Sequence, residues 1–343
     1  MLPTSITNVN QLEALLSEPT SGVVDMLRRL DGDIILLGVG GKMGPTMARM
    51  AKRASDLAGT KRRVIGVSRF SSAHEESNLQ QHGVETIRCD LLDEDAVGQL
   101  PDAPNVVFMT GMKFGSTGQE SLTWAMNAYL PSIICKKYRR SRVVAFSTGN
   151  VYGLAPVSGG GSREDDAPNP VGEYAMSCLG RERIFEHFSR TLGIPMALIR
   201  LNYAAELRYG VLVDLAQRVW REEPVDLGMG YFNILWQGDA NAMSLQAFDA
   251  VAVPPAAINV TGPELLSVRW AAERLGERMH KTPRFVGTEG STALLSNARP
   301  ALDRFGAPRV PAEQLLHWVA EWIIRCGPTL GKPTHFESRE GTF

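Results

Sequence analysis

Tyr174 and Cys178 lie four residues apart in the segment EYAMSCLGRER, which has the pattern of a helix. Residues at this spacing share one face of a helix, so the two side chains are expected to lie together. A tyrosine with its ordinary pKa of about 10 is only about 0.1% ionised at pH 7, so it acts as a base where a nearby cation lowers that pKa. Cysteine supplies no positive charge. Tyr174 is therefore either an acid–base group that needs another cation or a half-buried tyrosine without a chemical role.

The segment GVGGKMG is a second group of residues with possible chemistry. It follows the apolar run DIILL and precedes PTMARMAKRAS, which has the pattern of a helix. Gly38, Gly41 and Gly44 are spaced three apart, and glycines at such a turn let backbone N–H groups approach a pyrophosphate at a helix N-terminus. We expect these glycines, with Lys42 and Met43, to hold a dinucleotide. The alternative is a glycine turn with a purely structural use.

The residues that follow the next two predicted strands bear on which dinucleotide is bound. An acidic residue after the second strand would bind the ribose 2′-hydroxyl of NAD, but Ser68 and Arg69 stand there in VIGVSRF. An arginine can hold the 2′-phosphate of NADP, so NADP is favoured over NAD, unless Arg69 merely faces water. Asp90 and Leu91, in CDLLD after the third strand, are expected beside the adenine.

The elements that must position these residues alternate along the chain. Short apolar runs and helical stretches follow one another over about 170 residues, which predicts a doubly wound parallel sheet whose ligands bind beyond the carboxyl ends of the strands. The expected strands are 33–37, 64–67, 86–88, 106–109, 143–146 and 197–200. The expected helices lie near 42–57, 72–81, 117–138 and 172–192.

The alternation weakens after residue 203, which predicts a Rossmann-type α/β fold with a smaller C-terminal α/β substrate-binding cap. In the cap we expect short strands at 231–236, 257–260 and 284–286, and helices near 209–222, 240–250, 266–280 and 311–326. Helical spacing of apolar residues also predicts two short helices within residues 8–30, broken at Pro19. We divide the chain into four parts. Residues 1–30 form a helical extension and residues 31–203 a dinucleotide-binding domain. Residues 204–330 form mainly the cap, with segments returning to the sheet, and residues 331–343 an irregular polar tail.

Composition restricts the class of protein. The 343 residues are 44% hydrophobic and carry a net charge of -1, which gives no electrostatic footprint for nucleic acid or an anionic membrane. The chain has no stretch of about 20 apolar residues that would span a membrane and no secretory pattern at its start. The four cysteines are far apart and fit neither a disulfide framework nor a zinc site, so we expect no metal and a reducing cytoplasm.

The order and spacing of these pieces resemble the extended short-chain dehydrogenase/reductase family, the NAD-dependent epimerases and dehydratases that act mostly on nucleotide sugars. The resemblance covers roughly residues 33–325. Its matching pieces are GVGGKMG, CDLLD, TGMKFG after the fourth strand, FSTGNVYG after the fifth, Tyr174 in its helix, LIRLN, and in the cap FNILWQGDAN and INVTGPELLSV.

The resemblance implies a Thr/Ser–Tyr–Lys catalytic set. Thr148 would hydrogen-bond the substrate oxygen, and Tyr174 would exchange a proton with it while hydride moves at the nicotinamide. The family lysine that holds the nicotinamide ribose and lowers the tyrosine pKa is replaced by Cys178. Lys113, in TGMKFG, is the preferred candidate for the missing charge, and Arg181 is the alternative.

Further cofactor contacts implied by the resemblance are Thr110 and Gly111 in the TGMKFG segment and Asn127 in the long helix that follows. Cys178 itself has two interpretations. It is either a small apolar filler or a nucleophile or redox sensor, which would need a lowered pKa and a nearby base.

Two functions remain open from the sequence. The first is an NAD(P)-dependent epimerase, dehydratase or reductase that interconverts a ketone and an alcohol on a sugar, sugar acid or nucleotide sugar. The second is a catalytically impaired dinucleotide-binding protein that regulates or supports a complex. The enzyme is favoured because Thr148 and Tyr174 are both kept. The resemblance also implies a homodimer paired through the helices near 117–138 and 172–192.

Overall fold

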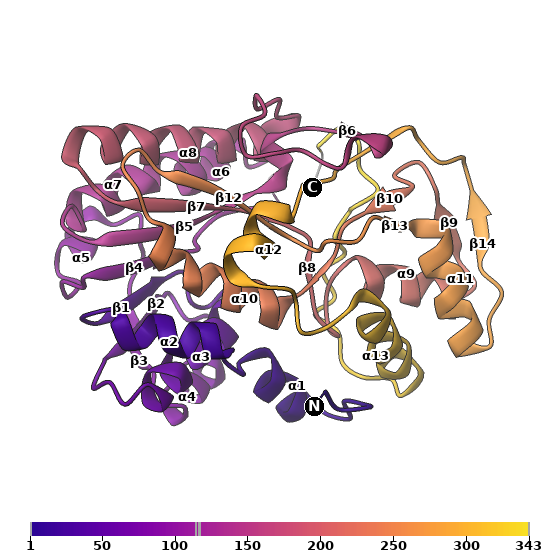
Figure 1. Ribbon diagram of the computed structural model, residues 1–343, viewed down its shortest axis with the longest axis horizontal. Coiled ribbons are helices and arrows are strands. Elements are labelled where there is room, and N and C mark those ends of the chain that lie inside the picture. The colour runs from indigo at the N-terminus through magenta and orange to yellow at the C-terminus, as the bar shows by residue number, and fades with distance from the viewer. Residues whose placement is uncertain (1, 114, 116–117, 342–343) are drawn as a thin grey trace.

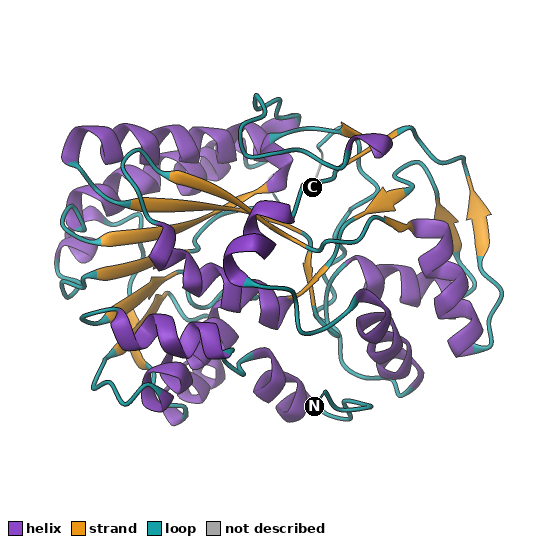
Figure 2. Ribbon diagram, in the orientation of Figure 1, coloured by secondary structure: helices purple, strands orange, loops and turns teal. Residues whose placement is uncertain are grey.

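A parallel sheet with helices on both faces forms one half of the molecule (Figure 2). The structure, a computed structural model, describes residues 2–113, 115 and 118–341. Within these residues the strands of the sheet are β1 (Ile34–Leu37), β2 (Val64–Ser68), β3 (Glu85–Arg88), β4 (Asn105–Phe108), β5 (Arg142–Thr148), β7 (Met196–Asn202) and β12 (Ala256–Thr261). Their order across the sheet is β12-β7-β5-β4-β1-β2-β3, and every neighbouring pair is parallel.

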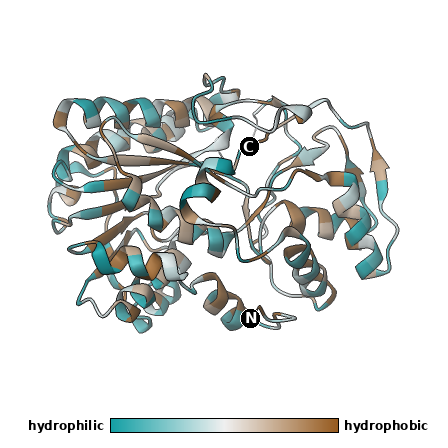
Figure 3. Cartoon of the chain, in the orientation of Figure 1, coloured by the Kyte–Doolittle hydropathy of each residue, from teal (hydrophilic) through white to brown (hydrophobic). Residues whose placement is uncertain are grey.

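This strand order confirms the predicted Rossmann-type fold, because β3 to β7 follow the doubly wound order 3-2-1-4-5-6. Each strand predicted before residue 203 overlaps an observed strand, and the one predicted at 257–260 is β12, which returns to the sheet. All residues of β1 and β4 are buried, as expected for apolar strands covered on both faces. In Figure 3 these central strands are mainly in the apolar colour.

Two layers of helices enclose the sheet (Figure 1). One layer contains α5 (Glu94–Gly98), α6 (Glu120–Trp124), α7 (Leu130–Lys137) and α8 (Gly172–Leu192). The other contains α2 (Ser21–Arg29), α3 (Gly44–Leu57), α4 (Ala73–Gln81), α10 (Gln237–Gln246) and α12 (Arg299–Phe305). The helix predicted near 117–138 begins at α6 and continues through a π-helical turn, Ala125–Tyr129, into α7. Residues 114 and 117 of the predicted segments lie outside the described residues.

The two predicted N-terminal helices are confirmed as α1 (Val9–Leu16) and α2, on either side of Pro19. The side chains of Asn8 and Thr20 cap them by accepting hydrogen bonds from backbone N–H groups. The two helices join different hydrophobic cores. Apolar residues of α1 belong to the core of the second half of the molecule, whereas those of α2 pack beneath the sheet.

The second half of the molecule has a hydrophobic core of its own, to the right in Figure 1. Its helices are α9 (Val211–Trp220), α11 (Val268–Met279) and α13 (Ala312–Ile324). Its short strands pair as β8 (Ala204–Ala205) with β11 (Leu235–Trp236), β9 (Pro224–Asp226) with β14 (Arg284–Val286), β10 (Tyr231–Phe232) with β13 (Leu266–Ser267), and β6 (Ala155–Pro156) with β15 (Thr292–Ala293). Short 3₁₀ turns occur at Gly149–Val151, Val157–Gly159 and Ala247–Ala250.

The single strand predicted at 231–236 is wrong, because β10 and β11 belong to different sheets. Asn233 lies between them. Its side-chain amide donates to the Glu264 carbonyl oxygen and accepts from the backbone N–H of Ser296, at 2.9 Å and 3.0 Å. These contacts interrupt the strand and tie it to two other segments.

The C-terminal segment is irregular, as predicted, but it is anchored to the second half of the molecule. Phe336 is buried with its ring centroid 6.5 Å from that of Phe232. The Arg339 guanidinium donates to the carbonyl oxygens of Gly228 and Thr292 at 3.0 Å and 2.9 Å. None of the described helices combines the length and apolar character that crossing a membrane requires.

Candidate active site

A cavity of about 870 Å³ opens beyond the carboxyl ends of β1, β4, β5 and β7. Most of its lining comes from within segments 40–46, 109–113, 146–150, 201–211 and 330–334. The first four segments follow the strands, and the last belongs to the anchored C-terminal segment. This is where a doubly wound sheet places its ligand, next to the switch point between β1 and β4.

The glycine turn forms one wall of the cavity. Gly41, Lys42 and Met43 line it, and α3 begins directly after them. Gly38 has φ +90°, and a Cβ there would lie 2.4 Å from Thr110 Oγ1. A Cβ on Gly44 would lie 2.1 Å from the carbonyl oxygen of Val39. The turn therefore needs glycine at both positions, and it presents a helix N-terminus, the usual site for a phosphate group.

Thr148 and Tyr174 both line the same cavity, although they come from different elements. Thr148 ends β5, and Tyr174 lies in the first turn of α8. The Thr148 hydroxyl accepts hydrogen bonds from the backbone N–H and the side-chain amide of Asn150, at 3.2 Å and 3.1 Å. Its own proton is thereby directed away from Asn150, so this hydroxyl can act as a donor inside the cavity.

Burial raises the pKa of Tyr174 well above its ordinary value. The charge of Arg181 and a hydrogen bond from Thr148 act in the opposite direction. Tyr174 therefore rests in its protonated form, in which it can donate a proton. Acting as a base requires positive charge nearby to stabilise the phenolate.

Cys178 is fully buried one turn after Tyr174 and packs with Val151 and Tyr152. Burial raises the pKa of its thiol, and it does not contribute to the cavity wall. A protonated, enclosed thiol is a poor nucleophile. These contacts agree with the apolar-filler interpretation and give no support to the nucleophile interpretation.

Lys113 lies inside the cavity with its ammonium nitrogen 5.8 Å from the ring centroid of Tyr174. Burial lowers its pKa to about 8, and the charge of Asp214 acts in the opposite direction. Arg181 is buried behind the cavity wall and donates to the carbonyl oxygens of Phe146 and Asn127. Both predicted cations therefore approach Tyr174, and Lys113 is the one exposed to a ligand.

Asn127 contacts both the loop that carries Lys113 and the side chain of Arg181. It lies buried in the π-helical turn, a feature often found at functional sites. Its side chain accepts from the Met112 N–H at 2.9 Å and from Arg181, and donates to the Met112 carbonyl oxygen at 3.0 Å and Ser177 Oγ at 2.9 Å. Asn127 therefore holds the loop that carries Lys113, rather than lining the cavity.

A buried ion pair fixes α8 against the sheet. Arg200 of β7 and Glu182 of α8 meet at 2.8 Å, with 8% and 3% of their side chains exposed. Ser147 Oγ donates to the same carboxylate at 2.6 Å. Because Ser147 precedes Thr148 and Glu182 follows Tyr174 on its helix, this pair sets the distance between the two candidate catalytic groups.

The predicted adenosine contacts lie outside the cavity lining. Arg69 has 74% of its side chain exposed and its guanidinium lies 3.9 Å from the carboxylate of Asp90. Leu91 is buried in the apolar core under the sheet. Ser68 lies beside the glycine turn, since a Cβ on Gly40 would be 2.6 Å from its Oγ.

Two further predicted contacts are tied to the sheet and the buried network. Thr110 donates to the Leu37 carbonyl oxygen at 3.1 Å. Gly111 lines the cavity, and a Cβ there would lie 2.4 Å from Arg181 Nη2. Thr110 therefore shapes the wall, and Gly111 leaves room for the buried guanidinium.

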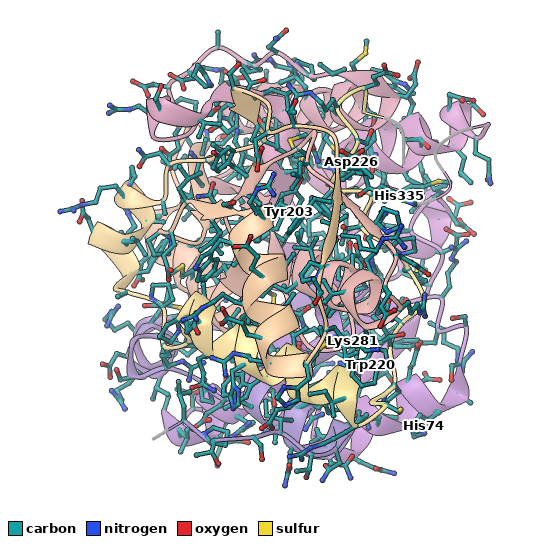
Figure 4. The ribbon with its side chains drawn as sticks, turned by 90° about the vertical axis from the view of Figure 1, so that its right-hand side faces the viewer. His74, Tyr203, Trp220, Asp226, Lys281 and His335 are labelled. Atoms are coloured by element: carbon teal, nitrogen blue, oxygen red, sulfur yellow. The ribbon has the colours of Figure 1, made fainter. Side chains whose placement is uncertain are left out.

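Sequence reasoning missed several residues of the cavity. His74 and Asn78 of α4 line it. Both residues follow the second strand, and this position could have marked them as cavity residues. Tyr203 and Tyr209 line it as well, within the segment near 203–215 that the sequence predicts to border the substrate; Figure 4 labels His74 and Tyr203 and shows them well apart. Lys332 also lines the cavity but stands in no motif, so no signal existed for it. The part of the chain that the structure describes contains no cluster of His, Cys, Asp and Glu side chains placed to hold a metal ion.

The sheet, its glycine turn and the cavity at the switch point define a Rossmann-type α/β protein with a nucleotide-sized site. The chain belongs to the NAD dependent epimerase/dehydratase family, whose sequence model matches residues 34–205. This confirms the resemblance drawn from the motifs. Comparison with curated proteins found no match.

Several solved structures share the fold. A dTDP-glucose 4,6-dehydratase from Bacillus anthracis in complex with NAD superposes with a TM-score of 0.72 at 15% identity, covering 86% of this chain and 97% of that chain. A UDP-glucuronic acid 4-epimerase from Bacillus cereus with UDP-glucuronic acid and NAD gives 0.70 at 18%, covering 86% and 99%. A UDP-glucose 4-epimerase from Thermotoga maritima with UDP-glucose gives 0.68 at 18%, with the same coverage. At these identities the likeness concerns the fold.

Proposed function

We propose that this protein is an NAD(P)-dependent enzyme that interconverts an alcohol and a ketone on a sugar, sugar acid or nucleotide sugar. The observation that carries the proposal is the meeting of Thr148, Tyr174 and the glycine turn in one cavity. Its volume of about 870 Å³ is at the upper end of the range of about 300–1,000 Å³ for small-molecule sites, which supports a cofactor and substrate held together.

The residues at the glycine turn fit a dinucleotide diphosphate. Gly40 and Gly41 are exposed at the cavity, and α3 begins directly behind them. The backbone N–H groups of Gly41, Lys42 and Met43 would hold the diphosphate, and the nicotinamide would supply or accept the hydride. Two of the structural neighbours, the dehydratase and the glucuronic acid epimerase, are complexes with NAD, which supports this assignment.

Thr148 and Tyr174 would handle the substrate oxygen. Thr148 donates a hydrogen bond to it, with its hydroxyl oriented by Asn150. Tyr174 gives a proton to the oxygen of a ketone, or takes one from an alcohol. The second direction needs the phenolate, which Lys113 and Arg181 stabilise through their charge.

The proposal is tested on the purified protein. The co-purifying dinucleotide is identified, and nicotinamide absorbance is followed with a panel of sugars, sugar acids and nucleotide sugars. Tyr174→Phe should reduce turnover at least about a hundredfold while cofactor affinity is kept. The control is Tyr231→Phe, outside the cavity, which should retain activity. Unchanged turnover in Tyr174→Phe would refute the proposed acid–base role.

A second function is favoured by one observation, the buried neutral Cys178 at the place of the family lysine. In that case the protein binds a dinucleotide for a regulatory or scaffolding purpose. Tight dinucleotide binding without turnover on any substrate of the panel would support this alternative against the enzyme.

We also propose that the protein forms a homodimer through the outer surface of α6 to α8. Leu122, Trp124 and Met176, all from these helices, are large apolar side chains exposed to solvent. Light scattering should give twice the chain mass, and Leu122→Glu with Met176→Glu should give the monomer. A monomeric wild-type protein would reject the dimer.

All four cysteines are free thiols, in keeping with the proposed cytoplasmic location.

A further inference from the structure

Three lysines from distant parts of the chain meet at the cavity. Lys42 belongs to the glycine turn, Lys113 to the loop after β4, and Lys332 to the C-terminal segment. The charges of Lys113 and Lys332 both act on Lys42. Like charges repel, and the repulsion is stronger where water is excluded. Three lysine side chains at one cavity therefore favour the binding of a negatively charged group, which reduces their mutual repulsion.

The Lys42 ammonium is placed to act inside the cavity. Its nitrogen is buried and lies 3.3 Å from the ring centroid of Tyr209. The ring attracts an ammonium group but has no net charge, so it orients the cation without cancelling it. Burial lowers the pKa of Lys42 to about 7, and Lys113 and Lys332 contribute to this shift.

The acidic groups whose charges act on Lys42, Asp214 and Glu206, also contact other residues. Asp214 accepts hydrogen bonds from the backbone N–H and the hydroxyl of Thr334. Glu206 pairs with Arg208 at 2.9 Å. Their charges raise the pKa of Lys42, but by less than burial and the two lysines lower it. The balance of charge around Lys42 is therefore positive.

The C-terminal segment holds Lys332 in place on both sides. Before it, the Leu330 N–H donates to the Arg208 carbonyl oxygen at 2.9 Å. After it, Thr334 is buried against Asp214, and Phe336 enters the core. Lys332 is thus a fixed part of the cavity wall rather than a side chain on a loose tail.

We propose that Lys42, Lys113 and Lys332 form an anion subsite at the substrate end of the cavity, so that the substrate carries a carboxylate or phosphate group near the reacting carbon. The inference rests on the proposed function, because it names the substrate class of that same site. Lys113 places the subsite beside Tyr174, at 5.8 Å from its ring centroid. The backbone N–H groups of the turn would hold the cofactor diphosphate, which leaves the Lys42 side chain to bind the second anion.

Binding of the anion is coupled to a proton. The groups that face Lys42 are Lys113, Lys332, Asp214, Glu206 and the Tyr209 ring. An anion raises the pKa of Lys42 from about 7, so binding above pH 7 takes up a proton. Calorimetric titrations at pH 8 in two buffers of different ionisation enthalpy should show this uptake.

The experiment uses the full chain saturated with its dinucleotide, titrated with glucose, glucuronate and glucose 1-phosphate. An anionic probe should bind at least about tenfold more tightly than glucose, and Lys42→Met and Lys332→Ala should each remove about tenfold of that affinity. The probe with the higher affinity identifies the anion as carboxylate or phosphate. Lys136→Ala, which removes an exposed ammonium of α7, is the control and should change nothing.

Unchanged anion affinity in both lysine variants, equal affinity for glucose, or binding of neither anion at millimolar concentration would overturn the inference. Lys332 is exposed, so Lys332→Ala decides the matter even where Lys42→Met fails to fold. Failure of the proposed function has a different signature. In that case the dinucleotide does not bind, or turnover persists in Tyr174→Phe.

Discussion

The ammonium nitrogen of Lys113 lies 5.8 Å from the centroid of the Tyr174 ring. Lys113 comes from the loop after β4, and Tyr174 from the first turn of α8, so only the packing of α8 on the sheet brings them together. Cys178, one turn after Tyr174, is a buried neutral thiol. We infer that the positive charge on the cavity side of the tyrosine comes from this other loop, while Arg181 of α8 acts from behind the cavity wall.

Replacing Lys113 tests this relationship. Lys113→Met should lower kcat about a hundredfold, because the phenolate loses its nearest cation inside the cavity. Lys113→Arg keeps the charge and should retain more activity than Lys113→Met. Steady-state rates at saturating cofactor and substrate provide the measurement. A Lys113→Met enzyme with wild-type kcat would assign the charge to Arg181 instead.

The pH dependence of kcat should report the same lysine. The pKa of Lys113 is lowered to about 8, so its charge is present below that pH and is lost as the pH rises through it. We expect kcat to fall above about pH 8. In Lys113→Arg this decline should disappear, since a guanidinium stays protonated throughout the range. An identical alkaline limb in wild type and Lys113→Arg would show that another group titrates.

Cys178→Lys introduces the lysine expected from the family resemblance, but it should not give a faster enzyme. The position is buried and within electrostatic reach of Lys113 and Arg181, so a third cation there would be repelled. We expect a loss of several kcal/mol of stability and no rise in kcat. Cys178→Ala is the control and should be far milder. Combining Cys178→Lys with Lys113→Met should recover part of the lost activity. A stable and faster Cys178→Lys single variant would contradict the argument.

Asn127→Ala should weaken the site from behind the cavity wall. It removes hydrogen bonds to Met112, Ser177 and Arg181, leaving buried polar groups without their partner. The expected cost is about 1–3 kcal/mol of unfolding free energy, with a fall in kcat because the loop carrying Lys113 loses its support. Urea unfolding measures the first effect. Asn10→Ala, at an exposed position of α1, should leave both quantities unchanged.

Arg69 tests the choice of dinucleotide. Its guanidinium is exposed and can bind a 2′-phosphate, so Arg69→Ala should weaken NADP binding about tenfold and leave NAD within about twofold. Fluorescence titration of both dinucleotides measures this difference, with Arg140→Ala as an exposed control. Equal affinities for NADP before and after the substitution would remove Arg69 from the cofactor site.

Local sequence determined the strands of the seven-stranded sheet, most helices and the glycine turn. Apolar runs such as β1 are buried on both faces, and that burial leaves a pattern readable within a few residues. Gly38 and Gly44 are readable for a similar reason, because the turn excludes any side chain at these positions. The place of Thr148 and Tyr174 at one cavity also followed from the sequence, through the order and spacing of the family motifs.

Tertiary structure alone decided which charged and aromatic groups surround that cavity. Lys42 meets Tyr209, and Lys332 arrives from the C-terminal segment. None of these contacts lies within one element, so no periodicity or spacing encodes it. A sequence pattern reports how one segment alternates between core and solvent. The electrostatics of a cavity depend on distances between segments, which are settled when the hydrophobic cores pack and bring the loops together.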